Sequence, residues 1–155
     1  MTDRAASLVI GIGNRLREDD GAGYRMAETL ALRPIRGVQV LSVQQLSAEL
    51  ASTLSEFHRV LFIDATPEPI RRTSWSAACV ELIEPEDAPP SGFSHQLSPR
   101  VLLAITKALY ATVPQAWQLL IPGLHWNHGE AYSPLTAAAV AASLPLVMSW
   151  SAVDA

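Results

Sequence analysis

The sequence predicts an α/β fold: a three-layer α/β/α sandwich on a mixed five-stranded sheet with one antiparallel strand. Three observations lead to this class. Short β-rich runs alternate with segments of helical periodicity along the chain. One connection between two such runs is too short for a parallel return. The 155 residues, 49% of them apolar, suffice for the core of one domain, which we expect to span residues 1–155.

The first half of the chain predicts three strands separated by two helices. In order, these are a strand at Ser7–Gly13, a helix from Asp20 to Leu32, a strand at Val38–Val43, a helix at Ser47–Phe57 and a strand at Arg59–Asp64. The helical face of the first helix carries Tyr24, Ala27, Leu30 and Ala31. The run RVLFID is almost continuously apolar, which is typical of a central strand in a parallel sheet.

The second half predicts an antiparallel strand and two further helices. The turn-rich segment TPEPIRRTS cannot hold a crossover helix, so Trp75–Ile83 is interpreted as an antiparallel partner of the third strand. Ser98 and Pro99 give the N-cap and first turn of a helix that runs to about Tyr110. The strand Gln115–Ile121 follows, and a second Ser-Pro start opens a helix from Ser133 to about Leu144.

Composition and charge argue against several classes of partner. The 11 Lys and Arg residues against 15 Asp and Glu leave a net charge of −4 without a basic block, so no nucleic-acid partner is expected. Apolar runs such as Val140–Met148 are short and interrupted by Ser143 and Pro145, so no membrane partner is expected. The single Cys79 and the lack of a secretory h-region indicate a cytoplasmic protein. The sequence leaves the oligomeric state open.

Three distant segments are expected to meet at one edge of the sheet. Four of the strands should be parallel, and ligands bind at the carboxyl edge of such sheets. The segments Gly13–Gly23, Asp64–Thr66 and Phe93–Gln96 all fall there and bring Asp20, Asp64 and His95. Two carboxylates and an imidazole suit a divalent transition metal. The alternative is structural: Asp64 would cap a loop, and His95 would hold no ligand.

The glycines of GIGNRLREDDGAG suggest a dinucleotide fingerprint, but the match fails. G-x-G-x-x-G would need glycine where Leu16 stands, and Asp19 and Asp20 at the helix start would repel a phosphate. One of these two aspartates, with Asp19 the first candidate, is expected to cap the helix. The other would then be free to act as a hard oxygen ligand.

The remaining candidates have weaker signals. In HWNHGE, His125 and His128 with Glu130 could form an extra metal or substrate contact, or the segment could be a polar surface loop with a partly buried Trp126. His58 is interpreted as structural, Cys79 as a small buried hydrophobe, and the pair Arg71–Arg72 as a solvated turn or a contact for an acidic partner. Neither G-x-S-x-G nor H-E-x-x-H occurs, which argues against a serine hydrolase and a conventional zinc protease.

The blocks LVIGIGNRLREDDGAG, VLFIDA and GFSHQ, in this order, resemble the hydrogenase maturation endopeptidases. The similarity runs from Leu8 to about Ala142 and includes the closing GEAYSPLTAAAV. It implies a mixed five-stranded sheet between helices. It also implies a metal-dependent cytoplasmic endopeptidase that removes the C-terminal tail of a nickel-loaded hydrogenase large-subunit precursor.

Carried over residue by residue, the resemblance assigns the metal-contacting and catalytic positions to Asp20, Asp64 and His95. Gly13 and Asn14 match the turn of the family and are expected to shape the cleft. The nickel is expected to arrive with the precursor, which is the expected partner. Two other functions stay open: a non-catalytic module that binds or chaperones a nickel protein, and a nucleotide-binding domain suggested by Gly11 and Gly13.

Overall fold

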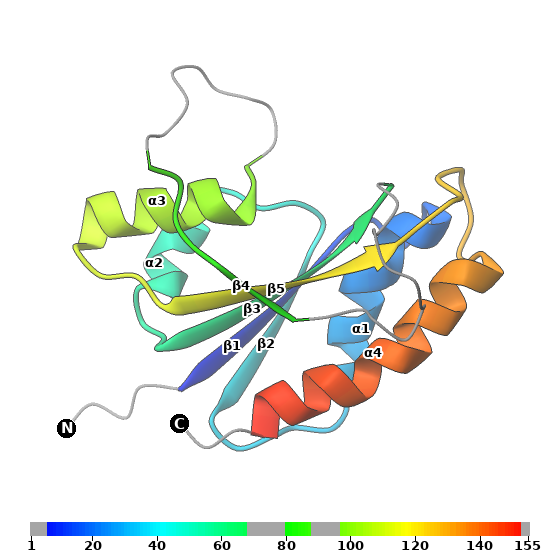
Figure 1. Ribbon diagram of the computed structural model, residues 1–155, viewed down its shortest axis with the longest axis horizontal. Helices are drawn as coiled ribbons and strands as arrows, with labels where there is room; N and C mark the ends of the chain where they lie inside the picture. The colour runs from blue at the N-terminus through cyan, green and yellow to red at the C-terminus, as the bar shows by residue number, and fades with distance from the viewer. Residues whose placement is uncertain (1–5, 68–79, 88–96, 153–155) are drawn as a thin grey trace.

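A computed structural model describes residues 6–67, 80–87 and 97–152 of the chain (Figure 1). Within these residues, five strands form one sheet in the order β2-β1-β3-β5-β4. The elements are β1 (Ser7–Ile12), the 3₁₀ turn η1 (Glu18–Gly21), α1 (Ala22–Ala31), β2 (Val38–Val43), α2 (Leu50–Leu54), β3 (Arg59–Thr66), β4 (Glu81–Ile83), α3 (Pro99–Tyr110), β5 (Gln115–Pro122) and α4 (Pro134–Ala152).

The sheet is mixed, as the sequence predicts. β1, β2, β3 and β5 are parallel, while β4 runs antiparallel to its neighbour. The predicted partner of the antiparallel strand is wrong, because β4 pairs with β5 and not with β3. β3 has no free edge: β1 pairs along one side, and β5 pairs along the other over all eight residues from Arg59 to Thr66. The portion Trp75–Cys79 of the predicted strand lies outside the described residues.

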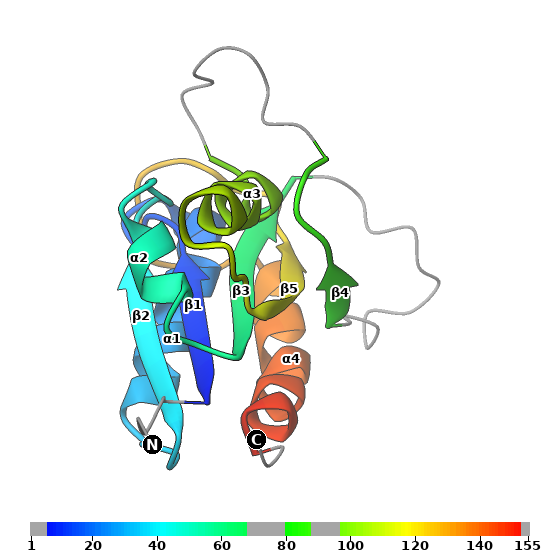
Figure 2. The same cartoon turned by 90° about the vertical axis from the view of Figure 1, so that its left-hand side faces the viewer.

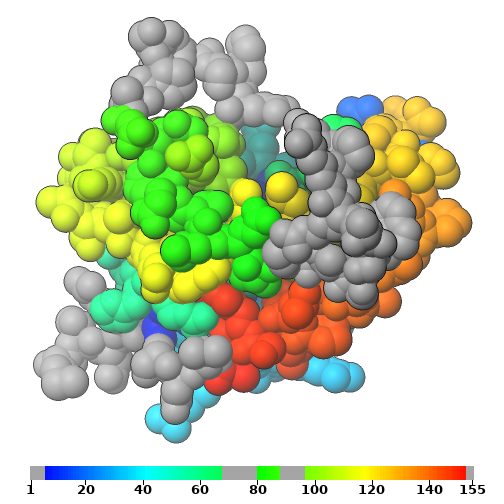
Figure 3. Space-filling model, in the orientation of Figure 1, coloured from blue at the N-terminus to red at the C-terminus, as the bar shows by residue number. Residues whose placement is uncertain are grey.

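Helices cover both faces of the sheet, which confirms the three-layer fold (Figure 2). Side chains of successive strand residues point to opposite faces, so Leu8 and Ile10 pack in the core beneath α2 and α3. Val9 and Leu61 pack in the other core, beneath α1 and α4. The face shown in Figure 3 is formed by α3, β4 and α4.

The first two helices differ from their predicted bounds. α1 begins at Ala22, because Glu18–Gly21 form a 3₁₀ turn before it. Its buried stripe includes Met26, Ala27 and Leu30, whereas Ala31 is exposed. α2 has only five residues instead of the predicted Ser47–Phe57. Leu54 and Phe57 are nevertheless buried, so the apolar stripe was predicted better than the helix length.

The last helix is longer than predicted. α4 continues through Pro145 to Ala152, although proline removes a helical hydrogen bond and normally ends or kinks a helix. Val147 and Trp150, both beyond Pro145, are buried against the sheet, and this packing offsets the local cost. By length and composition α4 could also cross a membrane. Here its residues Ala139, Val147 and Trp150 belong to the core.

Candidate active site

The candidate site is a cavity of about 820 Å³ at the carboxyl edge of the parallel strands. Asp20 and Asp64 both line it, together with Gly13 and Asn14. Ser98 and Pro99, which open α3, also line it. The structure thus brings together the first two predicted segments and the start of the helix that follows the third. His95 and the rest of Phe93–Gln96 lie outside the described residues.

A tight turn after β1 places the first acidic segment against the strand ends. Gly13 has φ +145°, and a Cβ built there would lie 1.9 Å from the carbonyl oxygen of Asp20, so only glycine fits. Gly23 at the start of α1 is equally constrained, because its Cβ would lie 2.2 Å from the carbonyl oxygen of Ile63. These close approaches bring Asp20 to the end of β3.

Asp20 is half-buried and lines the cavity. A hydrogen bond from the preceding turn holds its carboxylate. The backbone N–H of Asn14 donates to Asp20 Oδ2 at 3.0 Å. Asn14 also closes its own turn, because its side-chain Oδ1 accepts from the N–H of Leu16 at 2.9 Å. The predicted cleft-shaping role of Gly13 and Asn14 stays a prediction. In the structure Gly13 packs against the backbone of Asp20, and Asn14 donates a hydrogen bond to its carboxylate.

Asp64 lies near the end of β3 and is half-buried. Burial raises the pKa of Asp64, the hydrogen bond from the N–H of Ala65 at 2.8 Å lowers it, and the negative charge of Asp20 raises it further. The resulting pKa is about 7, well above the ordinary 3.8. Asp64 can therefore take up or release a proton near neutral pH, which is what a general acid or base requires.

Asp19 has a structural role that the sequence did not predict. It is fully buried, and its carboxylate accepts hydrogen bonds from the N–H groups of Leu124, His125 and Ser133 and from the Ser133 hydroxyl, at 2.7–2.8 Å. Burial alone would raise the pKa of Asp19, but these donors outweigh it and lower the pKa to about 2. The predicted helix cap is wrong, because neither η1 nor α1 has a side-chain cap.

The segment between β5 and α4 forms one wall of the cavity through Trp126. It is joined to the segment before α1 by backbone hydrogen bonds from Glu18 N to Gly129 O, 2.7 Å, and from Gly129 N to Leu16 O, 2.8 Å. Arg17 also lines the cavity, and its guanidinium donates to the carbonyl oxygen of Trp126 at 3.0 Å. Sequence reasoning missed Arg17 and Trp126 as cavity residues. Arg17 lies within the block GIGNRLREDDGAG, but there the sequence marks it only as one of the charged residues of its turn, and Trp126 lies outside the blocks that carry the resemblance.

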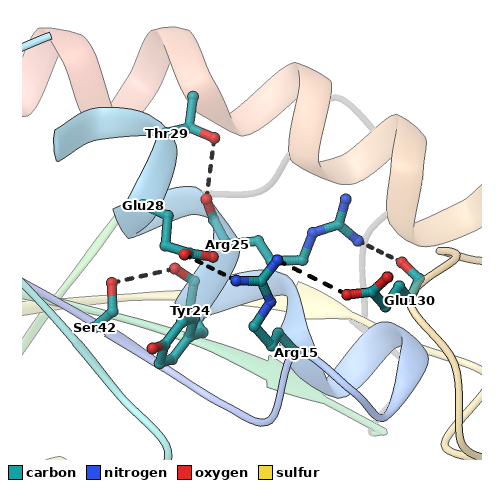
Figure 4. Close-up of polar contacts among 7 residues, drawn as sticks. All are labelled: Arg15, Tyr24, Arg25, Glu28, Thr29, Ser42 and Glu130. Atoms are coloured by element: carbon teal, nitrogen blue, oxygen red, sulfur yellow. Dashed lines mark hydrogen bonds and ion pairs between the residues drawn. The ribbon is translucent and has the colours of Figure 1, made fainter. Parts of the chain in front are cut away.

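Two arginines connect α1 to the same segment on the outer surface (Figure 4). Arg15 pairs with Glu28 at 3.1 Å and with Glu130 at 3.8 Å. Arg25 donates to the carbonyl oxygen of Glu130 at 2.6 Å, and its guanidinium lies 4.1 Å from the centroid of the Tyr132 ring. These exposed contacts add to the hydrogen bonds made by Asp19.

The histidines in the described part of the chain do not extend the site. His125 and His128 are exposed with Glu130 in a surface loop whose Trp126 is half-buried, which agrees with the surface-loop alternative. His58 is exposed at the amino edge of the sheet, where its backbone pairs with Ala6 and Gln115.

Residues 6–67, 80–87 and 97–152 contain no group of three potential ligands able to hold a metal ion. The predicted set of Asp20, Asp64 and His95 includes a position outside these ranges, so it stays a prediction. Cys79 and the pair Arg71–Arg72 also lie outside the described residues.

No protein-family model matches this sequence, and no curated protein sequence matches it. Solved structures do match. The hydrogenase 2 maturation peptidase of a Thaumarchaeota archaeon has a TM-score of 0.67 and 18% identity, over 96% of this chain and 99% of that chain. The NiFe hydrogenase maturation protease HycI of Thermococcus kodakarensis has a TM-score of 0.68 and 18% identity, over 96% and 93%. The maturating endopeptidase HybD of Escherichia coli has a TM-score of 0.64 and 19% identity, over 94% and 91%.

The chain therefore has the fold of the hydrogenase maturation proteases, which confirms the predicted resemblance at the level of the fold. The similarity extends along nearly the full length of both chains in each pair. At this level of identity it defines the architecture, and the activity has to be argued from the site.

Proposed function

We propose that this protein is an endopeptidase that removes the C-terminal tail of a nickel-loaded hydrogenase large-subunit precursor. The observation that carries the proposal is the pair Asp20 and Asp64, which line one cavity at the carboxyl edge of this fold. Solved proteins with the same fold are named hydrogenase maturation peptidases, proteases or endopeptidases. The reaction would take place in the cytoplasm, in keeping with the single cysteine of the chain.

The donor set fits a divalent metal presented by the substrate. Asp20 and Asp64 line the cavity and can supply carboxylate oxygens to it, and a cation there would displace the proton from those molecules in which Asp64 is still protonated near neutral pH. His95 is the proposed third ligand. Nickel carried by the precursor would supply Lewis acidity at the peptide to be cut, or orient that peptide in the cavity.

The residues of the chain have distinct tasks in this proposal. The N–H of Asn14 holds the carboxylate of Asp20 in place, so that this ligand needs little reorganisation when substrate enters. A carboxylate oxygen of Asp64 that the metal leaves uncoordinated can accept a proton from an attacking water and return it to the departing amine.

The test is incubation of the purified protein with a hydrogenase large-subunit precursor from the same organism, loaded with nickel or kept nickel-free. Mass spectrometry should show tail release from the nickel-loaded form only. Asp20→Asn and His95→Ala should abolish release, whereas Glu49→Gln, a change at an exposed carboxylate outside the cavity, should not. Binding without cleavage would favour the non-catalytic module and overturn the proposal.

A further inference from the structure

Trp126 differs in burial from the other residues of its loop. Residues 124, 125 and 127–131 are exposed, whereas Trp126 is half-buried and lines the cavity that contains Asp20 and Asp64. In the part of the chain that the structure describes, Trp126 is not among the apolar residues that pack against either core. A large aromatic side chain at this position is therefore not needed to fill the interior of the domain.

The backbone around Trp126 is fixed on both sides. The N–H of His125 donates to Asp19 at 2.8 Å, and the N–H of Asn127 donates to Glu18 Oε1 at 2.9 Å. The carbonyl oxygen of Trp126 itself accepts from Arg17 at 3.0 Å. Three successive residues are thus held by the segment that leads into Asp20.

The indole ring of Trp126 packs against the backbone of Gly123. A Cβ at Gly123 would lie 2.6 Å from Trp126 Cη2 and 2.9 Å from Cζ2, so the six-membered ring rests directly on the backbone. A ring held in this way loses little conformational entropy when a ligand packs against it. The segment between β5 and α4, which carries Trp126, lies at the surface of the molecule (Figure 3).

The chemistry of the cavity indicates what should pack there. Leu46, Pro67 and Leu97 add apolar surface to the cavity that holds the two carboxylates. An ion alone would use only the acidic groups, whereas a peptide offers apolar side chains together with a polar backbone. Buried tryptophan contacts are among the strongest single contributions to recognition.

We infer that Trp126 is a specificity-determining residue that contacts an apolar side chain of the peptide segment cut at this site. The inference rests on the proposed endopeptidase function. Trp126 acts on substrate binding and takes no part in proton transfer, so its loss should affect affinity much more than the catalytic step.

The experiment compares Trp126→Ala, Trp126→Phe and Leu124→Ala with the wild-type protein, using the nickel-loaded large-subunit precursor. Trp126→Ala should raise KM and the Kd for the precursor by about tenfold or more while changing kcat by less than about twofold. Trp126→Phe, which keeps an aromatic ring, should recover most of the affinity. Leu124→Ala is the matched control, because Leu124 is exposed in the same loop and does not line the cavity.

Equal KM and Kd values for wild type and Trp126→Ala would overturn the inference while leaving the proposed function intact. A fall in kcat with unchanged KM would also overturn it. Wild-type protein that binds but does not cut would overturn the proposed function alone, and the Kd values would still decide the role of Trp126. Wild-type protein that neither binds nor cuts would overturn both. Unfolding midpoints of all variants exclude a loss caused by misfolding.

Discussion

The surroundings of Asp19 and of Asp64 differ in one decisive respect, although both lie at the same end of the sheet. Asp19 is fully buried and accepts four hydrogen bonds, three of them from backbone N–H groups. Asp64 is half-buried and accepts, within the described part of the chain, one hydrogen bond, from Ala65. The pKa of Asp19 is about 2, and that of Asp64 is about 7.

The comparison shows that burial alone does not determine the charge of an acidic side chain. Burial raises the pKa of both carboxyl groups, but only Asp19 has enough donors to reverse the effect. Asp19 is therefore an anion at neutral pH, and its hydrogen bonds organise the loop before α4. Asp64 lines the cavity and, within the described residues, accepts a single hydrogen bond, and the nearby charge of Asp20 adds to the cost of its ionisation.

The largest expected effect is that of Asp64→Asn. The amide cannot exchange a proton or act as an anionic ligand, so tail release should fall by about 100-fold or more.

The free energy of unfolding of Asp64→Asn should rise above that of the wild-type protein at alkaline pH. The folded-state pKa of about 7 lies above the ordinary 3.8, so Asp64 ionises less readily in the folded than in the unfolded protein. The Asp64 carboxyl group therefore lowers the free energy of unfolding as pH rises from about 4 to about 7. Asp64→Asn should therefore stabilise the protein by a few kcal/mol at pH 8 and hardly at pH 4.

Urea unfolding of wild type and Asp64→Asn at pH 4 and pH 8 measures this difference. Glu49→Gln, at an exposed position, should give the same stability as wild type at both values. If Asp64→Asn proved less stable than wild type at pH 8, then the Asp64 carboxylate would be stabilised in the folded state, and the contrast with Asp19 would disappear.

A large loss of stability is expected for Asp19→Ala. The change removes the acceptor of the N–H groups of Leu124 and His125, whose hydrogen bonds are partly buried, and of Ser133, whose hydrogen bond is buried. Each unsatisfied buried donor costs about 1–3 kcal/mol, so the free energy of unfolding should fall by about 3 kcal/mol or more. Denaturant unfolding at pH 7 tests this. A loss of under about 1 kcal/mol would mean that water replaces the carboxylate, and Asp19 would then not be the anchor of the loop.

Much of the fold could be predicted from local signals. The serine-proline starts at Ser98 and Ser133 fixed both helix beginnings, because a cap and a proline at the first turn act within a few residues. The apolar runs fixed the parallel strands for the same reason. Two of the errors lie where distant packing decides: the strand that pairs with β4, and the length of α4 beyond Pro145. The bounds of α1 and α2 were also wrong.

The site was less accessible to sequence reasoning. Asp20 and Asp64 could be placed at one edge, because parallel strands end on the same side. The hydrogen-bond partners of Asp19 could not be predicted from the sequence, since they lie 105–114 residues away in the loop before α4. Asp19 and Asp20 are adjacent and look alike in the sequence. Only the folded loop shows that Asp19 accepts hydrogen bonds within the protein, whereas Asp20 lines the cavity.

The acid range offers a second measure of Asp19. Its folded-state pKa of about 2 lies below the ordinary 3.8, so the stabilisation is complete above about pH 4 and is lost as pH falls through 2. The shift corresponds to about 2 kcal/mol. Wild type should therefore lose about this much more stability than Asp19→Asn between pH 4 and pH 2, measured by urea unfolding. Parallel pH profiles for the two proteins would contradict the pKa assigned to Asp19.

The smallest effect is expected for Glu28→Gln, which removes the ion pair between Glu28 and Arg15 (Figure 4). The side chains of both residues are more than 40% exposed, so water and salt screen their attraction. Unfolding free energies should differ by under about 0.5 kcal/mol, and less at 0.5 M salt. A loss as large as that of Asp19→Ala would show that the surface pairs, and not the buried carboxylate, hold the loop before α4. Because the fully buried Asp19 accepts from three backbone N–H groups whereas Glu28 pairs with one exposed side chain, we expect the buried carboxylate to dominate.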